Sequence, residues 1–135
     1  MLSHIHLGVR NFTQAFNFYA QLLPILDWKL RFKDESRPWA GWQPAEQPRP
    51  LFLIGVPYDG QAASPGNGQM VALLAPARGA VDRFHAMALA LGATCEGGPG
   101  LRPEYHADYY GTYLRDLDGN KLCVCHHEGA GGDSP

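Results

Sequence analysis

The two halves of the chain repeat one order of structural elements. They align with a constant shift of 66 residues, which matches His4 with Met70, Phe18 with Phe84 and Leu23 with Leu89. In each half an alternating strand leads into an amphipathic helix and then into three further strands. A unit this small cannot bury its sheet face alone. The repeat therefore predicts an α+β fold in which two βαβββ modules form curved sheets around a shared cup.

The first module is predicted to span about residues 1–58 of a single domain that covers residues 1–127. Residues 2–9 alternate as a strand, with His4 and His6 on the face opposite Ile5 and Leu7. The helix that follows is expected to end near Pro24, because proline cannot continue a helix. The remaining strands of this module are predicted at residues 28–32, 39–43 and 51–56.

A linker at about 59–68, rich in Gly, Ser and Pro, precedes the second module at about 69–127. This module is predicted to contain a strand at 70–75, a helix at 79–91, a strand at 93–96 and an irregular stretch at 97–108. A hairpin follows, with strands at 109–115 and 121–126 around the turn-forming sequence DLDGN. The end of the chain, 128–135, is expected to be a flexible tail.

Composition excludes several classes of partner. The net charge is −2 and no run of basic residues is present, so nucleic acid is not expected as a partner. No apolar stretch approaches the roughly 20 residues that span a bilayer, so no membrane partner is expected either. The three cysteines form no disulfide framework and suit a reducing compartment. These features predict a cytoplasmic protein.

Three segments carry a resemblance to a known family: SHIHLGVRNFTQAFNFYAQLL, GNGQMVALLAPARGAVDRFHAMALALGA and YYGTYLRDLDGNKLCVCH. Together they resemble the vicinal oxygen chelate superfamily, which includes glyoxalases, bleomycin resistance proteins and extradiol dioxygenases. The last segment is the most specific, because it resembles the closing hairpin that leads to a metal-binding glutamate in that family. The resemblance covers residues 1 to about 127.

The resemblance implies a cup in which a divalent ion, held by histidines and carboxylates, binds two adjacent substrate oxygens. The family's ligand positions fall on His4, Met70, Cys123 and either Phe52 or Leu53, so no carboxylate remains. Apolar filling by Met70 and Cys123 is one interpretation. A soft ion held by Met70, Cys123, Cys125 and His4 is the alternative. We therefore expect no cofactor, with a divalent metal or a soft ion left open.

The resemblance places residues 102–110 near the mouth of the cup, where Arg102, Tyr105, His106 and Tyr109 are predicted to line a substrate pocket. If a reaction occurs without metal, His106 is the candidate acid or base and Arg102 the candidate anion anchor. His6 is a further candidate for the pocket wall or for a replacement ligand. Trp39 and Trp42 are candidates for aromatic surface that covers the cup, and the alternative is that they cover the sheet or a subunit interface.

Two functions from different classes follow. One is a small-molecule binder similar to the bleomycin resistance branch, which holds an aromatic or amphipathic ligand in a metal-free cup. The alternative is a metal-dependent lyase or isomerase of the glyoxalase type that uses His4 with non-standard ligands; an extradiol dioxygenase would retain only His4 of its ligand set. A homodimer is expected from the resemblance and from the open edges of the sheets.

Overall fold

The computed structural model describes residues 1–129, so most of the predicted tail, 130–135, lies outside the described residues. The first module forms a four-stranded sheet in the order β1-β4-β3-β2. β1 runs parallel to β4, and the other neighbours are antiparallel. Its elements are β1 (His4–Gly8), α1 (Phe12–Leu22), β2 (Trp28–Asp34), β3 (Trp39–Pro44) and β4 (Leu51–Gly55).

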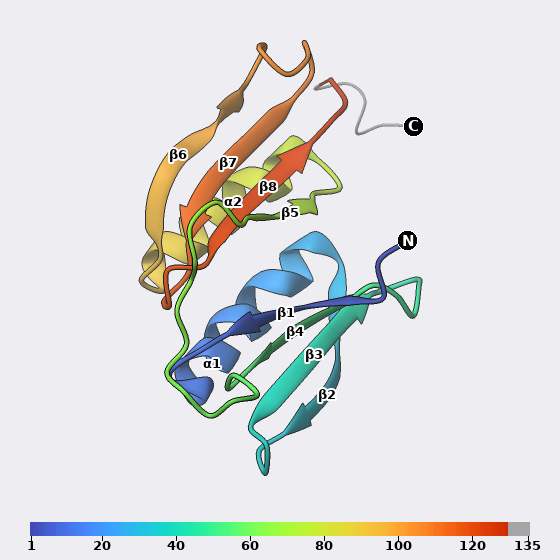
Figure 1. Cartoon of the computed structure of the whole chain (residues 1–135). Helices are drawn as coiled ribbons and strands as arrows, with labels where there is room; N and C mark the ends of the chain where they lie inside the picture. Colours follow the sequence, from blue (N-terminus) through green and yellow to red (C-terminus); the bar gives the residue numbers. More distant parts are fainter. Residues whose placement is uncertain (130–135) are drawn as a thin grey trace.

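The second module repeats this arrangement in a sheet with the order β5-β8-β7-β6, again with one parallel pair, β5 and β8. Each sheet carries one helix, and the two modules lie one above the other in Figure 1. The predicted α+β fold of two βαβββ modules is confirmed. The elements of this module are β5 (Val71–Leu74), α2 (Arg78–Ala90), β6 (Thr94–Leu101), β7 (Tyr110–Arg115) and β8 (Lys121–His126).

The helices begin and end close to the predicted positions. The side chain of Asn11 caps α1 by accepting a hydrogen bond from the backbone N–H of Gln14. α1 ends at Leu22, and Pro24 lies in the short 3-10 helix that follows, η1 (Leu23–Leu26). Within residues 1–129, neither helix is long and apolar enough to cross a membrane.

One strand is longer than predicted. β6 continues to Leu101 and so includes Pro99 and three glycines from the stretch predicted as irregular. β6 is the last strand of its sheet and pairs only with β7, with register shifts between Cys95 and Gly97 and between Gly97 and Gly100. An edge strand tolerates proline because one of its sides needs no N–H donor. The glycine- and proline-rich composition therefore indicates an irregular edge strand at this place.

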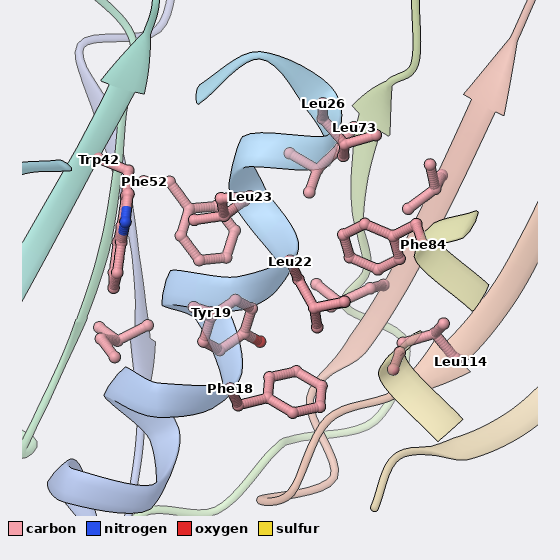
Figure 2. Close-up of a cluster of buried hydrophobic side chains, with 14 of the residues drawn as sticks. Phe18, Tyr19, Leu22, Leu23, Leu26, Trp42, Phe52, Leu73, Phe84 and Leu114 are labelled. Atoms are coloured by element: carbon pink, nitrogen blue, oxygen red, sulfur yellow. The ribbon is translucent and has the colours of Figure 1, made fainter. Parts of the chain in front are cut away.

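A single hydrophobic core joins the modules. Figure 2 shows α1 between the first sheet and the second module. Tyr19 of α1 packs against Phe52 of β4, with ring centroids 5.0 Å apart. Leu22 of α1 and Phe84 of α2 are fully buried in the same cluster. Each sheet therefore turns its helix-bearing face toward the other module.

The turn between β7 and β8 ties the modules together through a buried carboxylate. Asp116 accepts hydrogen bonds from the Tyr19 hydroxyl of α1, from the backbone N–H groups of Asp118 and Asn120, and from the Asn120 side-chain amide. The Asn120 amide also donates to the Gly8 carbonyl at the end of β1. Burial, followed by the nearby Asp116 charge, raises the pKa of Tyr19 well above its ordinary 10.0, which keeps this phenol a donor. The turn thus fixes one module on the other.

Replacing Tyr19 with Phe should destabilise the protein, because one oxygen of the buried carboxylate loses a donor. A buried group left short of a partner costs about 1–3 kcal/mol. Urea unfolding should show this loss as a lower midpoint with an unchanged slope. Tyr58→Phe is the matched control, since the Tyr58 side chain is 99% exposed. Equal midpoints for the two variants would contradict this role of Asp116.

Candidate functional site

The sheet faces that point away from the shared core carry two separate hollows. In β1, Ile5 and Leu7 pack against the core, so His4 and His6 point to the opposite face. That face bears a hollow of about 540 Å³, here called the first hollow. Its lining comes from β1, from the β2–β3 connection and from the segment after β4, and includes His6, Arg37, Trp39, Tyr58, Asp59 and Ser64.

Arg37 and Trp39 give the first hollow a cationic and aromatic wall. The guanidinium carbon of Arg37 lies 4.2 Å from the Trp39 ring centroid, a cation–π distance. Burial, and then the nearby His4 and Arg37, lower the pKa of His6 below its ordinary 6.5, so this imidazole is neutral at pH 7. A Cβ at Gly55 would lie 2.8 Å from the Trp39 Cβ and 3.1 Å from the His6 Nε2. Glycine at this position lets the two side chains lie over β4.

The structure separates the other residues predicted for this sheet. Trp42 is 1% exposed and stacks on Phe16 in the core, so it borders neither hollow. His4 lies on the outward face and is exposed, with its Nδ1 2.9 Å from the Ser3 hydroxyl. Phe52 belongs to the core, whereas Leu53 pairs with His6 in register and shares its face.

A second hollow of about 580 Å³ lies on the outward side of the other sheet. Its lining includes Met70, Tyr105, Tyr109, Tyr113, Arg115 and Lys121. No lining residue is shared with the first hollow, so the two hollows are separate within one chain. The Tyr109 hydroxyl lies 3.0 Å from the Tyr113 hydroxyl and 3.2 Å from the sulfur of Cys123, which is fully buried below it.

The thiols of β8 have unequal proton affinities. The neighbouring Cys125 thiol, followed by the Tyr109 and Tyr113 hydroxyls and the charge of Arg102, lowers the pKa of Cys123 to about 6 against the opposing effect of burial. The hydrogen bond to Cys123 and burial raise the pKa of Cys125. Burial, together with the bonds to Cys123 and Tyr113, raises the pKa of Tyr109. These shifts favour the thiolate at Cys123, with its neighbours as the donors.

The predicted polar segment 102–110 has only part of its residues at the second hollow. Tyr105 and Tyr109 line it, with ring centroids 5.0 Å apart. Arg102 donates to the Gly98 carbonyl at 2.9 Å and lies over the Tyr113 ring at 5.6 Å. His106 is exposed, and its Nε2 lies 2.9 Å from the Nδ1 of His127. The candidate acid or base thus pairs with an imidazole that follows β8.

The residues at the family's ligand positions do not fit a divalent ion that chelates substrate oxygens. His4 and Cys123 belong to different sheets, and Met70, 44% exposed, lies just before β5. These positions offer imidazole, thioether and thiol but no carboxylate, whereas hard divalent cations take oxygen ligands. Among residues 1–129, no group of three or more His, Cys, Asp or Glu side chains is arranged to hold a metal ion. These residues therefore support no catalytic step through such an ion.

Several residues at the hollows were missed by the sequence analysis, among them Arg37 and Tyr113. Arg37 stands two residues before Trp39, in a stretch whose four prolines obscure its structure. Tyr113 follows Tyr109 by four positions, and in a strand an even separation places both residues on one face. This parity was a usable signal for Tyr113, whereas nothing in the sequence indicated Arg37.

The fold and the outward hollows define the class: a paired βαβββ protein with sites on the sheet faces opposite its core. Residues 1–124 match the family model of the Glyoxalase/Bleomycin resistance protein/Dioxygenase superfamily. The chain belongs to this superfamily, which confirms the resemblance found in the sequence. No curated protein gives a significant match.

Solved structures of the same superfamily have similar folds. A glyoxalase/bleomycin resistance protein from Albidiferax ferrireducens T118 is 35% identical, with 93% of this chain and 98% of that chain covered and a TM-score of 0.83. A glyoxalase/bleomycin resistance protein/dioxygenase family enzyme from Burkholderia phytofirmans PsJN is 18% identical, with 93% and 98% covered and a TM-score of 0.69. A glyoxalase-related enzyme from Fulvimarina pelagi is 17% identical, with 93% and 87% covered and a TM-score of 0.71.

The thiolate absorbance of the folded protein should show a transition near pH 6 that belongs to Cys123. Cys123→Ser should abolish this transition, and Cys125→Ala should move it to higher pH by removing the main donor. The pKa of Cys123 in the folded protein lies below the ordinary 9.0 of a thiol. The Cys123 thiolate therefore stabilises the folded protein fully at pH values above 9.0. Its contribution is lost as the pH falls through about 6.

Ultraviolet titration of the three variants against the wild type provides the measurement. Cys95→Ser is the control, because Cys95 is exposed and lies on the edge strand β6. A transition near pH 6 that persists in Cys123→Ser and disappears in Cys95→Ser would contradict the assignment.

Proposed function

We propose that this protein binds a small aromatic or amphipathic molecule and that the first hollow is its primary site. The observation that carries this proposal is the cation–π pair of Arg37 and Trp39 beside the neutral imidazole of His6. The hollow, about 540 Å³, has a volume typical of small-molecule sites. The bleomycin resistance proteins in the shared superfamily support a binding role for the fold.

The walls of the first hollow favour a flat ligand that carries an acidic group. The Trp39 ring supplies a face for aromatic or aliphatic surface. Arg37 supplies donors suited to a carboxylate or phosphate. Neutral His6 can donate or accept one further hydrogen bond, depending on its tautomer. Asp59, also in the lining, repels a second negative group, so the preferred ligand is a monoanion.

A second copy of the chain is the proposed means of closing the cup. β1 and β5 are the end strands of their sheets, and an apolar groove of about 570 Å³, here called the edge groove, lies beside both. Unpaired strand edges are templates for pairing with another chain. A two-fold partner that sets its β5 beside this β1 would bring its second hollow next to this first hollow. The groove lining includes Leu2, Ile5, Leu26, Trp28, Met70 and Leu74.

A lyase or isomerase of the glyoxalase type is the other function considered. It would require His4 to share an ion with ligands that the family's positions no longer provide. Met70 and Cys123 are poor ligands for an ion that must polarise oxygen atoms. Binding without metal-assisted proton transfer is therefore the function that these residues support best.

Arg37→Gln should weaken the binding of an aromatic monoanion about 10-fold or more, because a hydrogen bond to a charged group contributes about 1.5–3 kcal/mol. Isothermal titration with 1-naphthoate and with its neutral amide provides the measurement. The wild type should prefer the acid, and the variant should bind both with similar affinity. Trp39→Ala should weaken both ligands.

Arg31→Gln is the matched control, since Arg31 lies on β2 outside the lining of the first hollow. A preference for the acid that survives in Arg37→Gln would contradict the site. Failure of the wild type to bind either compound, together with turnover of a carbonyl substrate, would contradict the binding function itself.

Leu74→Arg should convert a dimer into a monomer, because Leu74 lies on β5 in the edge groove and is 66% exposed. Light scattering coupled to size-exclusion chromatography at micromolar concentration measures the mass. Leu30→Arg is the control, since Leu30 is 49% exposed on β2, the opposite edge of the first sheet. A wild type that elutes as a monomer would contradict the shared cup.

A further inference from the structure

Two cysteine sulfurs and one histidine imidazole lie in a row along the outward face of β8 and just beyond its last residue. Cys123, Cys125 and His127 alternate along the strand direction, so their side chains leave the same face. The Cys125 sulfur lies 3.7 Å from the Nε2 of His127. These three residues are called the thiol ladder below. It lies on the second sheet and is independent of the ligand proposed for the first hollow.

The two thiols lie outside the core that joins the modules. The intervening residues Leu122 and Val124 belong to the shared core and are fully buried in it. Cys123 and Cys125 instead lie on the face that carries the second hollow, where the Cys123 sulfur is 3.2 Å from the Tyr109 hydroxyl. Burial alone would treat each thiol as a small apolar group, so the groups that surround the sulfur atoms decide what they can bind.

The surroundings of the thiol ladder favour the anionic form of sulfur. Tyr109 is within hydrogen-bond distance of the Cys123 sulfur, and Arg102 supplies a positive charge nearby. Thiolate is the form of cysteine that binds metals, and thiolates select soft ions such as Cu(I). Two thiolates with one monovalent cation leave a single negative charge, which the Arg102 guanidinium can compensate.

We propose that Cys123 and Cys125 form a two-sulfur site for a soft monovalent cation, with Cu(I) as the biological example. A two-coordinate site agrees with the finding that residues 1–129 hold no three-residue His, Cys, Asp or Glu cluster arranged for a metal. Cu⁺ forms one bond to each sulfur, every S–H bond present on the two thiols breaks, and each released proton leaves to solvent.

His127 gives the site its access to solvent. Its imidazole is exposed, whereas both sulfurs are buried. The Nδ1 of His127 lies 2.9 Å from the Nε2 of His106, which orients the ring so that its Nε2 faces Cys125. An outer hydrogen bond that fixes a histidine ring is a recurrent feature of metal sites. A cation can therefore reach the imidazole first and pass to the sulfurs.

Anaerobic titration with Cu(I) against the chelator bicinchoninate tests the proposal. The wild type should hold one equivalent of Cu(I). Cys123→Ser and Cys125→Ser should each bind more than about 100-fold more weakly, since even the loss of an outer-shell group costs up to about 100-fold. Cys95→Ser is the matched control and should bind like the wild type.

The control matters because Cys95 also has an imidazole partner, His85, at 3.3 Å. Loss of Cu(I) binding in Cys95→Ser alone would place the ion there and overturn the proposal. Cu(I) retention that survives both Cys123→Ser and Cys125→Ser would also overturn it. Should either variant fail to fold, copper K-edge absorption of the loaded wild type decides: two sulfur neighbours support the site, and only nitrogen or oxygen neighbours overturn it.

Discussion

The buried carboxylate of Asp116 is the constraint on which the relation between the modules depends. It accepts a hydrogen bond from the Tyr19 hydroxyl of the first module and further hydrogen bonds from backbone N–H groups of its own turn. Beside it, the carboxylate of Asp118 accepts the backbone N–H of Arg10 at 2.8 Å. The modules are thereby fixed with their helices inside and their hollows outside. The positions of both candidate sites follow from this arrangement.

Much of the fold could be read from the sequence because the repeat and the turn DLDGN have direct physical meanings. Helical and strand periods gave the order of elements, and Pro24 gave the end of α1. Composition misled at β6, where glycine and proline suggested irregular backbone but only marked an edge strand. Whether a segment rich in glycine and proline forms an edge strand depends on the strand beside it, and a single sequence does not show which strands are neighbours.

The candidate site was less predictable than the fold. Trp39 and Trp42 are three residues apart, and this odd separation places them on opposite faces of β3, the first at the hollow and the second in the core. The alternation of His4 and His6 was read correctly, but Arg37 comes from the connection between β2 and β3, whose path depends on tertiary packing. The sulfur of Cys123 was identified by its position, whereas its tyrosine partners required the folded sheet.

Neighbouring residues along β8 lie on opposite faces of the sheet and have different roles. Leu122 and Val124 belong to the interior that holds both modules, while Cys123 and Cys125 belong to the opposite surface. A mutation on that surface can therefore alter what the strand recognises without opening a void in the interior. The outward-facing residues of β8 can therefore change with little loss of stability, which suits a fold that binds many different ligands.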